Sequence, residues 1–444
     1  MNITKINDTV DKYSELILEA ERYIWVHPET GYKEVETTAY LVEQYEKLGY
    51  KLTRPNDITG FITEIDTGRE GPTLLILGEL DSIICPSHPE ANPETGAVHS
   101  CGHNAQSAAL LGIAAALADR TLLDGLSGKI RLCAVPAEEL LEIEFRKGLR
   151  DKGIIQYFGG KSEFLARGYF DGVDLAFMVH TAKAYTSMSG SVGCIAKNVI
   201  YKGKAAHAGG SPHNGINAVY ALTQGLSAAN ALRETFREAD IIRFHPIITG
   251  GGSMVNAIPE EARIESYVRG KSFDAIMREN KKINRALIGG ALSMGANVEI
   301  VDIPGYAPLR NSEGMLQLAK DAYELMRPGE TFTISPSYSS GSTDMGDLSS
   351  IMPVVHPYAA GASGNSHGND YYVTDPVSAC VDCAKWQIIM MTLLLEDGAE
   401  RAKSIIENYE APFKSKEAFL EYQNSIWSTG DRITWTEDGA VVKL

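Results

Sequence analysis

The chain has 444 residues, of which 44% are hydrophobic and 22% are charged, with a formal net charge of −16 at pH 7. Single hydrophobic cores stop growing near roughly 250 to 300 residues, so this length predicts two domains. The acidic balance excludes a nucleic-acid partner, because neutralising phosphates requires clusters of Lys and Arg that the sequence does not contain.

Membrane spans and targeting segments are not expected. The longest apolar run near the C-terminus, Ile388 to Leu395 with Thr392 inside it, is far below the ~20 residues that cross a bilayer. Met1 to Tyr13 carries early Asp and Lys residues and has no apolar core of the signal-peptide kind. Six cysteines in so long a chain do not resemble a disulfide framework. We therefore expect a cytoplasmic protein with reduced thiols and no membrane partner.

The first half of the chain alternates between predicted strands and helices. Residues 15–50 predict helices, with a turn at residues 27–31. Apolar runs typical of buried parallel strands lie at residues 73–77, 130–135 and 175–179, and an Ala- and Leu-rich helix is expected at residues 105–119. This alternation predicts an α/β fold, with a mostly parallel sheet and helices on both of its faces.

From about Gly190 the order of elements changes. Strands are expected at residues 191–201, 241–249, 262–268 and 298–303, and helices at residues 216–236 and 273–294. This β-α-β-β-α-β order is that of a ferredoxin-like α+β unit. We expect it to form a second, smaller domain inserted into the first, residues 190–303. The core domain would comprise residues 1–189 and 304–444, and its sheet would resume with a helix at residues 312–326 and a strand at Val354. No role is predicted for residues 412–444.

Potential ligands follow three predicted parallel strands, at the edge where such sheets form their sites. The three strands end in Gly78-Glu79-Leu80-Asp81, in Pro136-Ala137-Glu138-Glu139 and in His180, while Cys101 and His103 precede a helix. Taken singly, a buried cysteine is more often a small hydrophobe, and adjacent glutamates are more often a solvated face. Their coincidence at one edge favours a metal site, because charges gathered there without a cation would be costly. A Gly-rich loop adds His367, for which the plain alternative is a turn.

Seven strings of residues resemble one family of enzymes. The strings are GELD (78–81), SCGHN (100–104), VPAEE (135–139), MVH (178–180), GKAAHAGGSPHNGINA (203–218), NAIPEEARIESYVRG (256–270) and GNSHGND (364–370). In this order they resemble the metal-dependent aminoacylases and carboxypeptidases, which include auxin-conjugate and hippurate hydrolases. The match runs from His27 to about Asp375. CGHN and GSTDMGDLS resemble the aminobenzoyl-glutamate hydrolase branch most closely, because other branches commonly have Asp after the histidine.

The resemblance implies a role for each matching residue. Two divalent metal ions, zinc or manganese with cobalt as a further candidate, would be held by Cys101, His103, Glu139, His180 and His367. Glu138 would be the general base, and Asp81 would orient a ligand. In the inserted domain, His207 would cross a dimer interface to stabilise the oxyanion, while Asn256 and Arg269 would contact the carboxylate end of the substrate. The resemblance thus implies a homodimer, paired through the inserted domain. Such an enzyme would cleave the amide bond of an N-acyl or N-aminoacyl small molecule, such as aminobenzoyl-glutamate or a dipeptide.

Elementary chemistry agrees with this resemblance and leaves two alternatives open. Hydrolysis of an amide needs an activated water and a polarised carbonyl, and two metal ions roughly 3.5 to 4 Å apart supply both. A metal-binding homologue without turnover, acting as a binding or regulatory protein, would have no need of Glu138. A thiol hydrolase would instead use Cys101 as its nucleophile and would keep its activity in a chelator.

The remaining histidines and cysteines match no functional position. Structural roles are expected for His27, His88, His99, His213, His245 and His356. Cys380 and Cys383 have redox spacing but lie in a helical stretch, so we expect core cysteines there and a loop thiol at Cys85. Ser342 or Thr343 is expected to cap a helix.

Overall fold

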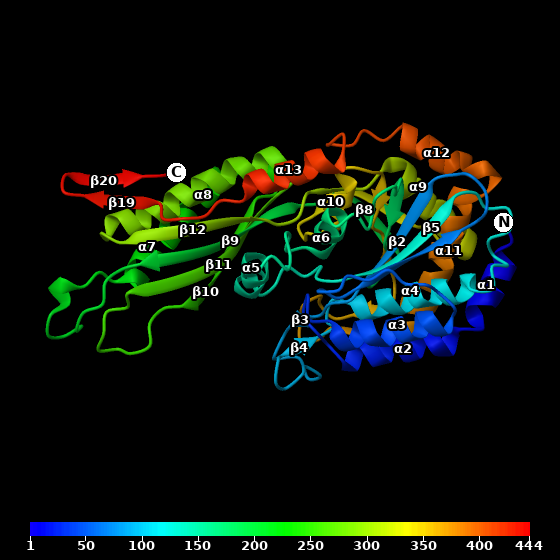
Figure 1. Cartoon of the computed structure of the whole chain (residues 1–444), viewed down its shortest axis with the longest axis horizontal. Helices are drawn as coiled ribbons and strands as arrows, with labels where there is room; N and C mark the ends of the chain where they lie inside the picture. The colour runs from blue at the N-terminus through cyan, green and yellow to red at the C-terminus, as the bar shows by residue number, and fades with distance from the viewer.

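The computed structural model describes residues 1–444, and Figure 1 shows an elongated molecule in two parts. One part is built on a five-stranded sheet with the order β1 (Phe61–Asp66), β5 (Lys129–Val135), β2 (Thr73–Glu79), β6 (Leu175–Phe177) and β15 (Val354–Val355). Every neighbouring pair is parallel except β1 and β5, which are antiparallel. The predicted, mostly parallel sheet is confirmed, and the antiparallel edge strand β1 is an addition to it.

Helices cover both faces of this sheet, as predicted. One face packs against α1 (Ile3–Asp11), α2 (Ser14–Val26), α3 (Val35–Lys47), α4 (His103–Leu117), α9 (Glu313–Met326), α11 (Cys383–Leu395) and α12 (Glu400–Glu407). The opposite face packs against α6 (Gly160–Ala166), α10 (Met345–Ser349) and α13 (Lys416–Ile426). Along β2, Leu74 and Ile76 point to the first set of helices while Leu75 and Leu77 point to the second. Burial on both faces explains why the strand is apolar throughout.

A second sheet of short strands lies beside the first and was not predicted. Its order is β13 (Leu309–Arg310), β8 (Thr186–Ser191), β16 (Tyr358–Ala359) and β7 (His180–Thr181), with β14 (Thr333–Ser339) also paired to β8. Two short ribbons complete this part, β3 (Ile83–Ile84) with β4 (Ala97–Val98) and β17 (Ala362–Ser363) with β18 (Tyr372–Val373). Ser191, where we predicted a strand to begin, is instead the last residue of β8 in this sheet. The predicted strand is β9, which begins at Gly193.

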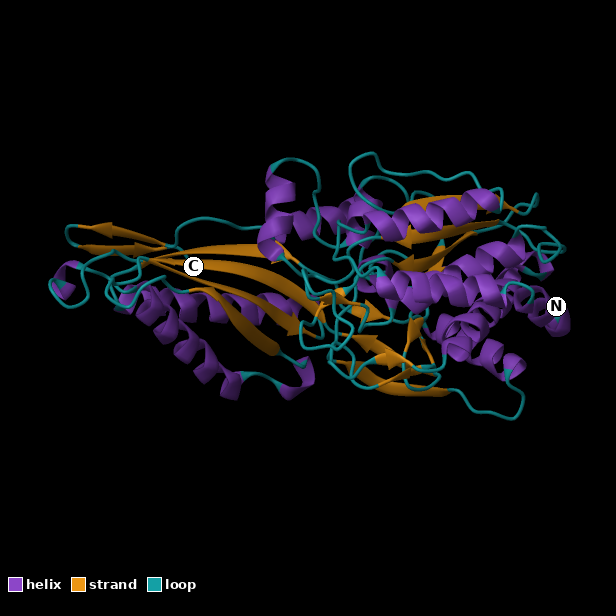
Figure 2. Cartoon of the chain, turned by 90° about the horizontal axis from the view of Figure 1, so that it is seen from below, coloured by secondary structure: helices purple, strands orange, loops and turns teal.

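The other part is the lid, a four-stranded antiparallel sheet with two helices on one face (Figure 2). The strand order is β10 (Arg243–Gly250), β11 (Glu261–Gly270), β9 (Gly193–Lys202) and β12 (Asn297–Pro304). The two helices are α7 (Ala218–Ala231) and α8 (Phe273–Ser293), and their apolar sides share one core with the sheet. This arrangement is the predicted ferredoxin-like unit. Near the catalytic part, the opposite face of the sheet packs against α5 (Ile143–Asp151) and the residues after it.

The C-terminal segment passes from the catalytic part onto the lid. The rings of Phe413 and Tyr422 pack against Phe273 at the start of α8, with centroids 5.5 and 5.0 Å away. Beyond α13, Ser428 pairs with Asp302 of β12, and a hairpin of β19 (Ile433–Thr436) and β20 (Gly439–Val442) follows. Figure 1 shows this hairpin beside the lid. The predicted domain ranges stay a prediction, but residues after Ser428 lie against the lid sheet and not against the catalytic part.

One helical stretch, Val377–Leu395, has the length and hydropathy of a membrane span. In the structure 72% of its apolar window is buried inside the protein, where it packs with α4 and α9. Cys380 and Cys383 lie in this stretch as buried free thiols, in agreement with the prediction.

Candidate metal centre and active site

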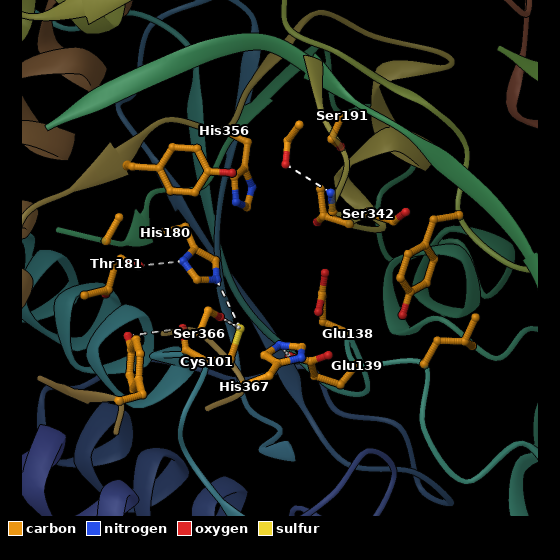
Figure 3. A pocket seen from close by; sticks show the side chains of 18 of the residues that line it. Cys101, Glu138, Glu139, His180, Thr181, Ser191, Ser342, His356, Ser366 and His367 are labelled. Atoms are coloured by element: carbon orange, nitrogen blue, oxygen red, sulfur yellow. Dashed lines mark hydrogen bonds and ion pairs between the residues drawn. The ribbon is translucent and has the colours of Figure 1, made fainter. Parts of the chain in front are cut away.

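The carboxyl ends of the strands bring the predicted ligands to one place (Figure 3). Cys101 Sγ lies 3.4 Å from His180 Nε2, and Glu139 Oε1 lies 2.9 Å from His367 Nε2. His103, at the start of α4, directs Nε2 toward Glu138 Oε2 at 4.0 Å. Residues separated by up to 266 positions therefore converge, because β2, β5 and β6 all end at this edge of the fold.

The donor atoms form three groups, and in each group the atoms lie within 4.8 Å of one another. Two groups share Cys101, namely Cys101, His103 and His180, and Cys101, Glu139 and His367, and the third is Glu79, His103 and Glu138. His103 Nε2 and Glu139 Oε1 are buried and form no well-directed hydrogen bond. Thiolate, imidazole and carboxylate together suit zinc, manganese or cobalt. The residues present thus fit two divalent cations.

The histidines control the ionisation of the two acidic groups. Burial and the neighbouring Glu139 oppose ionisation of Cys101, but the positive charges of the surrounding histidines lower the pKa of this thiol to about 5. Burial also opposes ionisation of Glu139, yet His367 holds the pKa of this carboxyl well below its usual range. The attraction of Glu139 raises the pKa of His367 to about 12. Both acidic groups are therefore anionic at neutral pH, which is the form that binds a metal.

The two adjacent glutamates have different environments. Burial, with the negative charges of Glu79 and Glu139 nearby, raises the pKa of Glu138 well above its usual range. In Figure 3 the Glu138 side chain points into the cavity while Glu139 turns toward His367. A carboxyl group with a raised pKa suits acid–base work, whereas one that is held in its anionic form suits ligation.

Asp81 links the two sides of this cluster. Its Oδ2 accepts a hydrogen bond from the Glu139 main-chain N–H at 2.8 Å, and its Oδ1 lies 3.3 Å from His103 Nδ1. The Asp81 carbonyl is a second partner of the same ring nitrogen at 2.9 Å. Asp81 is fully buried and lies behind the ligands, as the resemblance implies.

A buried lysine stands behind Glu79, and it was not predicted. Lys161 Nζ lies 2.6 Å from Glu79 Oε1 and also contacts the Asp344 carboxylate, and all three side chains are buried. Glu79 Oε2 in turn lies 3.2 Å from His103 Nε2. The Asp344 carboxylate therefore bonds to Lys161 and makes no capping hydrogen bond to α10. At the start of α10, Thr343 Oγ1 accepts a hydrogen bond from the Met345 N–H at 3.2 Å.

A cavity of about 590 Å³ opens over the cluster. Four of the predicted ligands, Cys101, Glu139, His180 and His367, line it, and the lid contributes Tyr267 and Arg269 from β11. Arg269 Nη1 donates to Ser342 Oγ at 3.2 Å and Nε donates to His245 Nε2 at 3.1 Å, and it pairs with no carboxylate. The predicted substrate contact Arg269 thus lies in the cavity as a cation without a counter-ion, and His245 supports it.

The other two predicted residues of the lid lie away from the cavity of their own chain. His207 and Asn256 are exposed on neighbouring loops, and the Ala208 N–H donates to the Asn256 carbonyl at 3.0 Å. His207 Nδ1 accepts hydrogen bonds from the main-chain N–H groups of Gly209 and Gly210. Neither residue lines the cavity.

His356 lines the cavity although only a structural role was predicted for it. It follows β15, its ring centroid lies 5.7 Å from that of His180, and its Nδ1 is buried without a partner. The strand-end rule that identified His180 applies equally to His356, because both side chains follow parallel strands of the same sheet. Tyr306 and Ser342 also line the cavity, and neither carries a sequence pattern that would reveal this.

Comparison with known proteins agrees with the fold and the cluster. Residues 75–390, more than half of the chain, match the model of Peptidase family M20/M25/M40, and the chain belongs to this family. N-acetyl-L-cysteine deacetylase of Bacillus subtilis is 29% identical over 319 residues, covering 68% of this chain and 70% of the relative. Xaa-Arg dipeptidase of Mus musculus is 27% identical over 390 residues, covering 82% and 81%. A p-aminobenzoyl-glutamate hydrolase polypeptide of Escherichia coli is 28% identical over 309 residues, covering 66% and 59%.

A solved structure supports the architecture. A dinuclear metal binding peptidase of the same family from Bacillus subtilis has a TM-score of 0.61 at 21% identity, and the match covers 87% of this chain and 99% of that chain. Family members are peptidases and amidohydrolases, and binding of two metal ions is typical of them. The three curated relatives named above have different substrates, but their sequence identities to this chain are nearly equal, at 27% to 29%. The comparison therefore does not single out the aminobenzoyl-glutamate branch.

Proposed function

We propose that this protein is a two-metal amidohydrolase that cleaves the amide bond of an N-acyl or N-aminoacyl amino acid. Cys101, His103, Glu139, His180 and His367 hold the metal ions in this proposal. The observation that carries it is the different placement of two adjacent carboxyl groups. The Glu139 carboxylate pairs with His367, whereas the Glu138 carboxyl group faces the cavity. A protein that only bound metal would have no use for the second.

The residues of the chain have distinct tasks in the reaction. Two divalent ions, when bound, supply Lewis acidity toward the amide carbonyl and the attacking water. Glu138 accepts a proton from the water and passes it to the leaving nitrogen, a task that fits its raised pKa. Asp81 fixes the orientation of His103 through its contacts to Nδ1, which leaves Nε2 as the donor atom for a metal ion.

The cavity favours a substrate with an anionic end. Arg269 faces the cavity without a carboxylate partner, and Ser342 lies next to it. A planar guanidinium matches a carboxylate through two parallel hydrogen bonds. Leu140, Leu141, Tyr267 and Tyr306 supply apolar walls for the remainder of the substrate. The named relatives act on an acetyl amino acid, a dipeptide and an aminobenzoyl-glutamate, and each of these carries a carboxylate.

Pairing of two chains through the lid completes the proposal. The outer edge of β12 is covered by Ser428 and Asp431, whereas the outer edge of β10 is free. Ile247 and Ile248 on β10 are 62% and 63% exposed. Exposed apolar side chains on an unpaired strand edge favour a self-complementary interface. Such a dimer gives His207 and Asn256 a route to the cavity of the partner.

A substrate panel tests the proposed function. The purified protein, stripped with a chelator and reloaded with zinc, manganese or cobalt, is assayed against acetyl amino acids, dipeptides and aminobenzoyl-glutamate. Metal-dependent release of a free amino acid supports the proposal. Full activity in the chelator would favour the thiol mechanism, for which the contact between Cys101 and His180 is the supporting feature. Metal binding without turnover on any amide would favour a binding protein.

A further inference from the structure

The two glutamates of the site lie on a turn with an unusual backbone. Ala137 has a φ of 57°, in the left-handed region that a residue with a Cβ occupies only when its surroundings hold it there. Strand β5 ends at Val135, so the turn begins directly after it. The conformation at Ala137 decides where the next two side chains point. The roles of Glu138 and Glu139 therefore depend on whatever stabilises this turn.

Three buried side chains hold the main chain of the turn. Glu34 Oε1 accepts the Ala137 N–H at 2.8 Å, and Asp81 Oδ2 accepts the Glu139 N–H at 2.8 Å. Arg146 donates from Nη1 to the Ala137 carbonyl at 3.4 Å and from Nη2 to the Glu139 carbonyl. The guanidinium thus contacts the carbonyls of the two residues on either side of Glu138.

Arg146 is buried, and its guanidinium bonds to main-chain carbonyls and forms no ion pair. It is 1% exposed, its third acceptor is the Phe158 carbonyl at 2.7 Å, and it donates to no carboxylate. Its Cζ lies 5.5 Å from the centre of the Tyr32 ring, within the range of a cation–π contact. A Cβ at Gly31 would collide with Arg146 Nη2, so the glycine at this position leaves room for the forked guanidinium group of Arg146. Burying a cation is costly, and only several well-placed acceptors compensate for it.

The same helix also contacts the lid. Glu144 of α5 pairs with Arg263 of β11 at 2.8 Å, and the Tyr267 hydroxyl donates to the Leu140 carbonyl. Figure 1 shows α5 between the lid strands and the catalytic part. Since β11 carries Arg269, the turn and the substrate-binding arginine share one support.

We propose that Arg146 is a positioning residue that fixes the turn Ala137–Glu139, and thereby aims Glu138 into the cavity and Glu139 at the metal ions. This inference rests on the proposed function, which assigns those two roles. Arg146 touches neither substrate nor metal. It acts through the carbonyls that flank Glu138, and loss of its fork lets Ala137 leave the left-handed region.

The test compares Arg146→Met with Arg150→Met. Arg150 lies one turn further along α5, donates to the Gln156 carbonyl and stacks 4.0 Å over Trp427, but it does not contact the turn. We expect Arg146→Met to lose about 100-fold in kcat, the scale of a ~1 Å misplacement, with KM changed by less than about threefold because Arg269 is intact. Metal affinity, measured by competition with a coloured chelator, should fall about 10- to 100-fold. Arg150→Met should lose thermal stability alone.

Two outcomes would overturn the inference. One is a folded Arg146→Met protein that keeps metal affinity and kcat within about threefold of the parent. The other is an equal loss of both quantities in Arg150→Met. If Arg146→Met does not fold, Arg146→Lys, which keeps the charge and removes the fork, is judged by the same criteria. Glu138→Gln distinguishes failure of the positioning role from failure of the role that the proposed function assigns to Glu138. Near-normal turnover by Glu138→Gln overturns the role of Glu138 as the base, whereas an inactive Glu138→Gln beside an unimpaired Arg146→Met overturns only the positioning role of Arg146.

Discussion

Asn104 Nδ2 donates a hydrogen bond of 2.7 Å to Glu21 Oε1, which joins the residue after His103 to helix α2 beneath the metal cluster. Both side chains are buried. Burial raises the pKa of Glu21 to about 7, and Arg22 and Asn104 only partly oppose this effect. An aspartate at position 104 would place a second carboxylate against Glu21, so the amide at this position fits its buried partner.

The Glu21 carboxyl predicts a pH-dependent stability. Its folded pKa lies above the unfolded value, so the folded chain binds the proton more tightly and loses stability as pH rises from about 4.5 to about 7. Glu21→Gln should therefore raise Tm at pH 8 by an amount equivalent to at most about 3 kcal/mol and leave it nearly unchanged at pH 5. Thermal unfolding at both pH values measures this effect. The exposed Glu19→Gln, on the same helix, is the control and should show no such difference, whereas an equal change at both pH values for Glu21→Gln would contradict the prediction.

Cys101 belongs to two of the three donor groups, so its removal should weaken both proposed metal positions. Elemental analysis of the parent should find about two divalent ions per chain, and Cys101→Ala should contain fewer. Cys85→Ala is the matched control, because Cys85 contacts Ser87 in its loop and does not line the cavity. A Cys101→Ala protein with its full metal content and full activity would remove this residue from the site.

Exchange of either neighbouring glutamate should have different consequences. Glu138→Gln should retain metal and lose about 10²- to 10⁴-fold in kcat, the usual contribution of a general base. Glu139→Gln removes the carboxylate that faces His367 and should lose metal first. Metal titration and steady-state kinetics on both variants distinguish the two roles. Near-normal turnover by Glu138→Gln would show that another group accepts the proton.

Arg269 should recognise the charge at the end of the substrate. Arg269→Met should raise KM for a carboxylate substrate by about 10- to 100-fold, the value of a charge-assisted hydrogen bond, with a smaller effect on kcat. The control is the same substrate with its carboxylate converted to an amide, for which parent and variant should have similar KM values. An equal rise in KM for both substrates would mean that Arg269 stabilises the lid and does not bind the substrate carboxylate.

His207 should act across a dimer interface, because it is exposed on the lid of its own chain. Glu138→Gln and His207→Ala are each expected to be inactive as homodimers. Refolding the two variants together creates mixed dimers in which one site has both groups intact, so activity should return. If verified mixed dimers stay inactive, or if the active parent is monomeric at assay concentration, His207 does not act in the partner's site.

Much of the architecture follows from sequence because its elements are local and strongly patterned. The apolar run of β2 predicts a strand buried on both faces, and the order of elements from Gly193 to Pro304 predicts the lid. The second sheet was missed because several of its strands have only two residues, too few for a hydrophobic period. Those strands form because the surrounding chain holds them in place.

The sequence predicted the residues of the candidate site that follow strands. It did not predict the residues that act through contacts with residues far away in the sequence. His180 and Glu139 lie a few residues after β6 and β5, two strands of the five-stranded sheet. The contact between Lys161 and Asp344 spans 183 positions, and no local pattern indicates it. Arg146 lies on an amphipathic helix, where an exposed charge is the ordinary expectation, and only the fold shows that its head group turns inward.

The crossing of residues 412–444 from one part to the other limits how the lid can rotate. The chain enters the lid before β9 and leaves it after β12, and a body attached at two points is free to swing about the line that joins them. The contacts of Phe413 with Phe273 and of Ser428 with Asp302 attach a further segment of the chain to the lid. A rotation of the lid relative to the catalytic part would therefore have to carry α13 with it or break one of these contacts. Helix α13 thus takes part in attaching the lid, although it contributes no side chain to the cavity itself.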